Sequence, residues 1–239
     1  MNVYKIGTAT ELIKGNRYVG RGIVIGKSAD GAKACLAYFI MGRSANSRNR
    51  ILSERGGAVF TEPFDLSKMQ DPSLIIYRAI RNYGNAVIVT NGDQTDTIYD
   101  GLAAGMSFSE ALTSRTFEPD APNFTPRISG ILYLSGRDFT YEMSILKSAD
   151  AGGTACDRQT FSYAALAGRG HFLHTYLCDG NPLPTFTGEP ERIAIPDSID
   201  DFAQELWDAL DEENKISLYV RYIDLKDGGV EKRLINKNA

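Results

Sequence analysis

Residues 18–41 read YVGRGIVIGKSADGAKACLAYFIM, and this stretch decides the expected fold. Two runs rich in β-branched and aromatic residues, 18–26 and 34–41, stand on either side of the turn-forming residues 27–31. That arrangement predicts two antiparallel strands joined as a hairpin. The chain is therefore expected to build a sheet around this hairpin.

Similar patterns along the rest of the chain predict an α+β protein. Hairpins dominate, so the sheets are expected to be mostly antiparallel, and the helices fall into two groups that are far apart in the sequence. Ser107 and Glu110 form a capping box, and Ser198 is the expected N-cap of an amphipathic helix. We expect two stacked sheets with helices outside, in one domain, residues 1–239. Further strands are expected at 58–61, 74–80, 86–90, 127–134, 139–146, 215–225 and 230–235. Residues 160–166, which also fit a helix, and residues 171–177 are expected to form another β pair. Helices are expected at 95–104, 107–114 and 198–210.

The composition limits the chemistry. The chain has 239 residues and a formal net charge of −4, which does not favour nucleic-acid or membrane-surface binding. Two histidines and three cysteines without CxxC spacing leave little material for a metal site, so neither a metal nor another cofactor is expected. There is no signal-peptide pattern and no apolar run of about 18 residues. We therefore expect a cytoplasmic protein; the sequence leaves its oligomeric state open.

Two glycine motifs in the first strand fail as nucleotide-binding fingerprints. Gly26-Lys27-Ser28 lacks the glycine that a phosphate-binding loop needs five positions earlier, where Arg21 stands. Gly20 and Gly22 lie within the β run, and no helix opens after them. We interpret these glycines as points of close backbone approach or a bulge.

An arginine-rich loop follows the second strand. Residues 41–50 read MGRSANSRNR, and with Arg55 they contain four arginines within thirteen residues. Guanidinium groups match phosphate and carboxylate oxygens and stay charged at any working pH. The alternative is a solvated basic loop. No acidic residue interrupts the loop before Glu54, which favours an anion-binding site.

Three further polar segments are candidates for the site. Residues 90–96, TNGDQTD, connect a buried strand to a helix, although turn and capping chemistry explains part of that pattern. Residues 117–128, FEPDAPNFTPRI, contain three prolines, which stiffen an irregular loop. Residues 174–190 contain a second proline-rich loop with aromatic residues that can wall a pocket.

Taken in order, these motifs resemble the archaeal-type IMP cyclohydrolase family. The resemblance spans about residues 18–190, and its strength lies in the ordered set rather than in one motif. The motifs are Tyr18-Val19-Gly20-Arg21-Gly22, Tyr38 through Arg43-Ser44 to Asn49-Arg50, Asn91-Gly92 with Thr95-Asp96, Glu118-Pro119-Asp120 through Thr125-Pro126-Arg127-Ile128, and Thr175-Tyr176 with Pro182-Leu183-Pro184 and Gly188-Glu189-Pro190.

The resemblance implies a function. The family closes the hypoxanthine ring of inosine monophosphate from the formamido-imidazole carboxamide ribonucleotide, with loss of water, in the last step of de novo purine synthesis. The resemblance also implies an α+β fold, a four-layer αββα sandwich of two mostly antiparallel sheets flanked by helices, like that of N-terminal nucleophile hydrolases. The family needs no metal or redox cofactor. The partner is then a small purine ribonucleotide 5′-monophosphate, not a nucleic acid or a membrane.

The resemblance also implies site residues. An arginine and a glutamate carry the ring closure, and they fall on Arg43 and Glu118. The loop after Arg43 is longer than the family's Ser-Phe-Pro-Asn-Arg form, so Arg48 and Arg50 compete for the place of the second arginine; Arg50 is our choice. The candidate substrate-binding residues are Arg21, Tyr38, Ser44, Arg50, Asn91, Asp96, Thr125 and Arg127.

Two other functions stay open at the level of sequence. An amide-bond hydrolase of the N-terminal nucleophile type would need a processed Thr, Ser or Cys terminus, and Met1-Asn2 offers none. A non-catalytic purine nucleotide-binding protein would bind the monophosphate without turnover.

Overall fold

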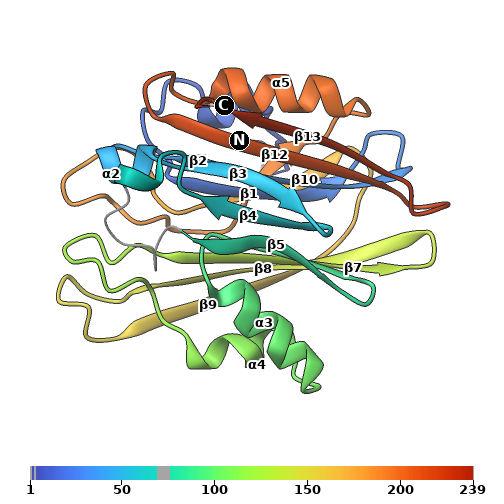
Figure 1. Cartoon of the computed structure of the whole chain (residues 1–239). Helices are drawn as coiled ribbons and strands as arrows, with labels where there is room; N and C mark the ends of the chain where they lie inside the picture. The colour runs from blue at the N-terminus through green and yellow to red at the C-terminus, as the bar shows by residue number, and fades with distance from the viewer. Residues whose placement is uncertain (1, 3, 69–75, 239) are drawn as a thin grey trace.

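Two antiparallel sheets stacked face to face form the centre of the protein (Figure 1). The computed structural model describes residues 2, 4–68 and 76–238. In spatial order, the six-stranded sheet contains β11 (Glu191–Ala194), β10 (Arg169–His174), β1 (Arg21–Lys27), β2 (Lys33–Met41), β12 (Lys215–Asp224) and β13 (Val230–Asn236). The seven-stranded sheet contains β3 (Ile51–Arg55), β4 (Ala58–Glu62), β5 (Tyr77–Tyr83), β6 (Ala86–Thr90), β7 (Arg127–Ser135), β8 (Asp138–Ser148) and β9 (Cys156–Ala164).

The expected first hairpin is present at the centre of the six-stranded sheet. β1 and β2 pair from Arg21 opposite Ile40 to Lys27 opposite Ala34. Because neighbouring side chains of a strand point to opposite faces, Ile23 and Ile25 enter the core between the sheets, whereas Val24 enters the core under the helices. Both faces of this hairpin are therefore buried, as its nearly continuous apolar pattern requires.

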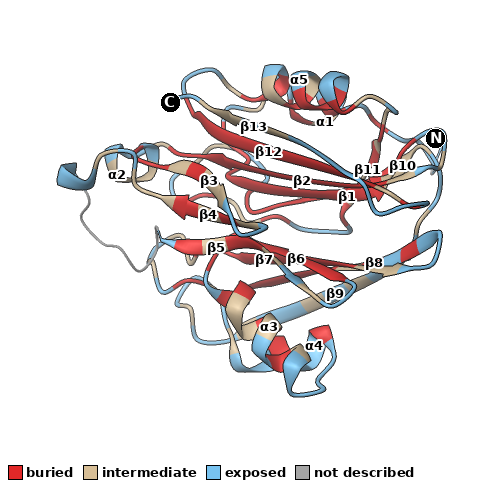
Figure 2. Ribbon diagram, turned by 45° about the vertical axis from the view of Figure 1, so that its right-hand side comes forward, coloured by how far each residue is buried: buried red, intermediate tan, exposed pale blue. Residues whose placement is uncertain are grey.

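Helices cover the outer face of each sheet (Figures 1 and 2). α1 (Ala9–Ile13) and α5 (Ile199–Ala209) pack on the six-stranded sheet, and α3 (Gln94–Ala103), α4 (Phe108–Ala111) and the 3₁₀ turn η2 (Leu112–Ser114) pack on the other sheet. Ser107 and Ser198 cap α4 and α5 as expected. The four-layer αββα prediction is confirmed, while the likeness to N-terminal nucleophile hydrolases stays a prediction. None of the helices in the described part is long and apolar enough to cross a membrane.

One expected pairing is wrong. Residues 160–166 and 171–177 do not pair with each other, because they lie in different sheets. β9 pairs with β8 at the edge of the seven-stranded sheet, and β10 pairs with β1 and β11 in the other sheet. Residues 165–168 carry the chain between the sheets instead of forming a hairpin turn. The expected strand 74–80 falls partly outside the described residues, and β5 is described from Tyr77 onward.

The glycines of β1 allow close packing, as interpreted from the sequence. A Cβ atom on Gly26 would lie 2.4 Å from the Cα of Gly170 in the paired strand β10. A Cβ atom on Gly22 would lie 2.2 Å from the ring of Phe39 and 2.8 Å from the ring of Phe172. These residues serve strand packing rather than phosphate binding.

Candidate active site

Four segments that are distant in sequence meet around a cavity of about 260 Å³. They are the start of β1, the loop through α2 (Ala45–Arg48), the 117–127 loop, and the segment after β10. Six of the ten candidate residues line it: Arg21, Arg43, Ser44, Arg50, Glu118 and Thr125. The other lining residues all lie in the polar segments or family motifs of the sequence but were not among the ten candidates; they are Tyr18, Asn46, Ser47, Asp120, Asn123, Tyr176 and Leu183.

Glu118 forms a buried ion pair with Arg21. The Nη2 of Arg21 lies 3.3 and 3.4 Å from the two carboxylate oxygens, and both side chains are about nine-tenths buried. Burial raises the pKa of Glu118 above its ordinary value, although Arg21, Arg127 and Arg50 oppose that rise. Burial by itself lowers the pKa of Arg21, but Glu118 and nearby tyrosines more than offset it, so Arg21 stays charged. The site therefore holds a carboxyl group that takes up a proton more readily than an exposed glutamate.

Unsatisfied polar atoms gather at this cavity. Six buried side-chain nitrogen or oxygen atoms in the described part of the chain have no hydrogen-bond partner, and three belong to the cavity: Nε of Arg21, Nε of Arg50 and Oδ1 of Asn46. Buried polar groups are normally paired, because an unmade hydrogen bond costs about 1–3 kcal/mol. Three of the six enclosed, unpaired polar atoms in the described part of the chain thus belong to residues that line this one cavity.

Arg48 and Arg50, the two candidates for the family's second arginine, have different surroundings. Arg48 donates from Nε to the carbonyl of Gly42 at 3.1 Å and from Nη2 to Oδ1 of Asn214 at 2.9 Å, so it fixes the loop. Arg50 is buried at the cavity and has no hydrogen-bond partner among the described residues. Ser44 and Ser47 form a capping box at the start of the short helix α2. Of the two arginines, only Arg50 lines the cavity.

Arg43 lies at the rim of the cavity. Its Nη1 donates to Oδ1 of Asp179 and to the carbonyl of Gly180 at 2.8 Å. Its guanidinium lies over the ring of Tyr18, 5.1 Å from the centroid, and Tyr18 stacks on Tyr176. These contacts hold one edge of the guanidinium, while Nε and Nη2 have no partner among the described residues.

A chain of hydroxyl groups, which we call the hydroxyl wall, forms another part of the lining. The Thr125 hydroxyl donates to the carboxylate of Asp120 and lies 2.6 Å from the hydroxyl of Tyr176. The Thr125 amide donates to the other oxygen of Asp120 at 2.6 Å. Burial raises the pKa of Tyr176, so its phenol keeps its proton and serves as a neutral hydrogen-bonding group.

The remaining candidate residues lie outside this cavity. Tyr38 is fully buried and hydrogen-bonded to Tyr77 at 2.8 Å. Asn91 is also buried, and its side chain bonds the backbone of residues 126 and 128, which anchors the end of the 117–127 loop. Asp96 forms ion pairs with two arginines of β5. Arg127 lines a second, neighbouring cavity.

The charges in the candidate active site suit a small anionic ligand. Three guanidinium groups and two carboxylates line it, which leaves a net positive charge in a chain that is negative as a whole. Among the described residues, no group of three or more His, Cys, Asp or Glu side chains is arranged to hold a metal ion. The groups present can bind oxyanions, orient a carbonyl and transfer a proton.

Fold and site together define a four-layer α+β protein with an arginine-rich pocket built around a buried carboxyl group. The chain belongs to the family of IMP cyclohydrolase-like proteins, whose family model matches residues 18–228.

Individual relatives are archaeal. The chain is 34% identical to the IMP cyclohydrolase of Methanococcus aeolicus over 119 residues, which is 48% of this chain and 58% of that protein. It is 39% identical to the IMP cyclohydrolase of Methanopyrus kandleri over 116 residues, 47% of this chain and 57% of that protein. With the enzyme of Methanococcus maripaludis strain C7 the identity is 30% over 147 residues, 56% of this chain and 71% of that protein. The chain thus spans less than two thirds of the length of the first two relatives.

Proposed function

We propose that this protein is an IMP cyclohydrolase. It closes 5-formamidoimidazole-4-carboxamide ribonucleotide to inosine monophosphate, in the cytoplasm, as a step of purine biosynthesis. The observation that carries the proposal is the buried Glu118 carboxyl group, with a raised pKa, in a cavity lined by three arginines. Family membership adds independent support.

The proposed reaction is an intramolecular condensation. The carboxamide nitrogen attacks the formyl carbon, a carbon–nitrogen bond forms, and a proton moves from that nitrogen to the formyl oxygen. The carbon–oxygen bond then breaks, and the hydroxyl leaves as water with the proton of the formamido nitrogen, which forms the new double bond to the former formyl carbon. The ring gains one carbon–nitrogen double bond, and no oxidation occurs. Because both reacting groups belong to one molecule, correct positioning supplies a large part of the rate.

Glu118 is the proposed proton carrier. As a carboxylate it accepts the proton from the attacking nitrogen, and as a carboxylic acid it protonates the leaving hydroxyl. The raised pKa favours the second step, because it stabilises the protonated form. Arg21 holds the carboxyl group in place through its two contacts at 3.3 and 3.4 Å.

Arg43 is the proposed electrophilic group. Its free Nε and Nη2 bind the carboxamide oxygen and stabilise the negative charge that develops there as the nitrogen attacks. Arg50 and Asn46, which line the cavity, bind further polar groups of the substrate. Thr125 hydrogen-bonds the substrate from the hydroxyl wall.

An ultraviolet assay of ring closure on synthetic substrate tests the function directly. Wild-type protein is expected to form inosine monophosphate, and a protein that binds this nucleotide without forming it would be a binding protein instead. Arg43→Gln is expected to lower kcat and Arg50→Gln to raise KM, whereas the exposed Arg137→Gln serves as the matched control. If Arg50→Gln lowers kcat while Arg43→Gln leaves it unchanged, the electrophilic role belongs to Arg50.

A further inference from the structure

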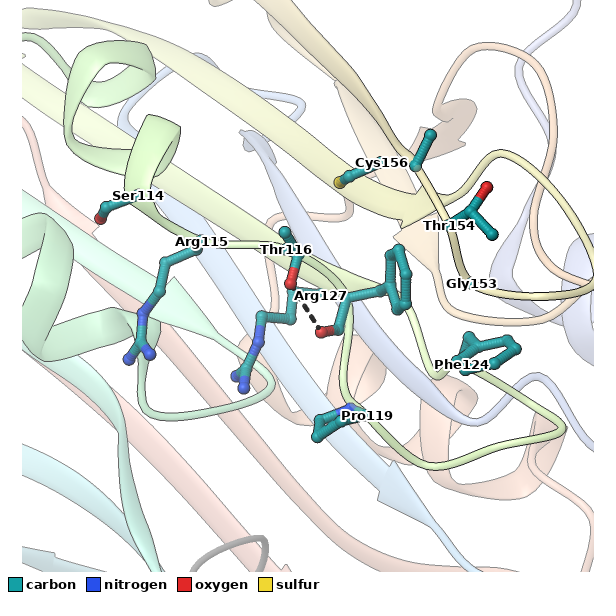
Figure 3. Close-up of a pocket in the computed structure, with 11 residues that line it drawn as sticks. Ser114, Arg115, Thr116, Pro119, Phe124, Arg127, Gly153, Thr154 and Cys156 are labelled. Carbon is teal, nitrogen blue, oxygen red and sulfur yellow. Dashed lines mark hydrogen bonds between the residues drawn. The ribbon is translucent and has the colours of Figure 1, made fainter.

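A second cavity of about 470 Å³ shares the 117–127 loop with the candidate active site (Figure 3). The loop is a wall between them, and its side chains divide between its two sides. Phe117, Pro119, Phe124 and Arg127 line the second cavity, whereas Glu118, Asp120 and Thr125 line the candidate active site. A volume of this size falls in the range of small-molecule sites, about 300–1,000 Å³.

Two arginines form one side of this second cavity. Figure 3 shows the side chains of Arg115 and Arg127 next to each other, with Phe124, Thr154 and Cys156 across from them. Both guanidinium groups bind the same carboxylate: Nη1 of Arg127 donates to Oδ1 of Asp93 at 2.7 Å, and Nη2 of Arg115 donates to Oδ2. Two positive charges therefore share one negative charge, and the pair keeps a net charge of +1.

Arg127 is buried but keeps donors available. It is 8% exposed, and Nη1 is its only nitrogen with a partner among the described residues, bonding Asp93 and Gln94. Its Nε and Nη2 are nevertheless absent from the fully enclosed polar atoms that lack a partner. These two donors are therefore not fully enclosed, and Arg127 is one of the residues that line the second cavity. Nη1 of Arg115 also has no partner among the described residues.

The rest of the lining supplies hydroxyl groups and an aromatic surface. Ser114, Thr116 and Thr154 each bring a hydroxyl. The rings of Phe117 and Phe124 lie edge to face, with centroids 5.4 Å apart, and the backbone of Gly153 leaves room for the Phe124 ring. Guanidinium pairs suit phosphate, hydroxyls suit a sugar, and phenylalanine rings suit a flat apolar base.

We propose that this second cavity binds a nucleoside monophosphate, with its phosphate on Arg115 and Arg127 and its base against Phe117 and Phe124. The binding does not depend on the proposed function, but its consequence for catalysis does.

A ligand in the second cavity would change the pKa of Glu118 in the candidate active site, because it would offset the charge of Arg127. Glu118 faces Arg21 from β1, Arg50 from the loop after α2, Asp120 from its own loop and Arg127 from β7. The positive charge of Arg127 lowers the pKa of Glu118. A phosphate that offsets this charge raises the pKa of Glu118, so the acid side of the ring-closure profile moves to higher pH.

Calorimetry with AMP, ribose 5-phosphate and inorganic phosphate tests the binding on the whole protein. Arg115→Gln is expected to weaken AMP binding at least about tenfold, the loss typical of a charge-assisted hydrogen bond. Arg50→Gln in the active site and the surface control Arg137→Gln are expected to leave this binding unchanged. AMP is expected to bind more tightly than ribose 5-phosphate because only AMP reaches the phenylalanine pair.

Ala155→Glu provides a second variant should Arg115→Gln not fold. Ala155 is an exposed residue of the lining, and a carboxylate there repels phosphate. No AMP binding at millimolar concentration, or binding that Arg50→Gln removes and the cavity variants do not, overturns the second site. Equal affinities for AMP and ribose 5-phosphate overturn the assignment to a nucleotide. These readouts need no catalysis, so they stay informative if wild-type protein fails to close the ring.

Discussion

Replacing Glu118 by glutamine removes the proposed proton carrier while keeping its size. General acid–base catalysis typically contributes about 10²–10⁴ in rate, so Glu118→Gln is expected to lower kcat by that factor, a barrier increase of about 3–5 kcal/mol. The variant also leaves Arg21 buried without its counter-ion. Breaking a buried pair in this way costs about 3–5 kcal/mol of stability. For a chain of this length that lowers Tm by roughly 6–20 °C.

The two effects need separate measurement, because an unstable enzyme also loses activity. Rates are measured by the ultraviolet assay well below the Tm of each variant, and stability by thermal unfolding. The exposed glutamate variant Glu189→Gln is the matched control. The double variant Arg21→Gln with Glu118→Gln removes both charges, so it is expected to regain part of the stability without regaining the rate.

The pH profile provides an independent readout. Ring closure begins with ionised Glu118, and burial raises its pKa above the ordinary value of 4.5. Wild-type kcat is therefore expected to fall on the acid side at a pH above 4.5, and Glu118→Gln to lose that dependence. A Glu118→Gln protein with full rate refutes the role of Glu118. A double variant that regains the rate together with the stability shows that the loss was structural.

Three further predictions concern neighbouring features. Asp179→Asn removes the ion pair of the partly exposed Arg43, so we expect the stability to change by less than about 1 kcal/mol in thermal unfolding. The same variant is expected to lower kcat roughly ten- to hundredfold in the ultraviolet assay, because Arg43 is no longer held in position. An unchanged kcat would contradict the positioning of Arg43. Gly22→Ala forces a Cβ atom against the Phe39 ring, and overpacking of this kind lowers the free energy of unfolding by about 1–3 kcal/mol in denaturant titration. Burial lowers the pKa of His171 from 6.5 to about 4, so only the unfolded chain takes up a proton in this window. The contribution of neutral His171 to the free energy of unfolding, up to about 3 kcal/mol, is complete above pH 6.5 and is lost as the pH falls towards 4. His171→Gln should flatten that decline, as measured by denaturant titrations at several pH values.

Local signals explain how much of the fold could be predicted. Capping residues and hairpin turns act over a few positions, so the helix at Ser107 and the strands around 135–138 follow from the sequence directly. The separation of β9 and β10 depends on which sheet each strand joins, and nearness in the sequence favoured the wrong pairing. Their burial patterns do differ: β9 alternates as an edge strand does, whereas β10 is almost wholly buried, as a strand inside a sheet is.

The candidate site shows where motif order stops being informative. Order along the chain grouped Arg127 with Glu118, because they share one motif, and could not separate Arg48 from Arg50. Packing separates both pairs. Arg48 is bound to Asn214, a residue 166 positions away, which leaves Arg50 free at the cavity.

The 117–127 loop separates the other pair, since its side chains divide between two cavities and place Arg127 behind Glu118 rather than beside it. A charge in that position acts on the proton affinity of Glu118 without touching a substrate bound in front of it. Removal of the Arg127 charge should therefore shift the pH profile of ring closure more than it changes KM. A residue that held the substrate would have the opposite effect.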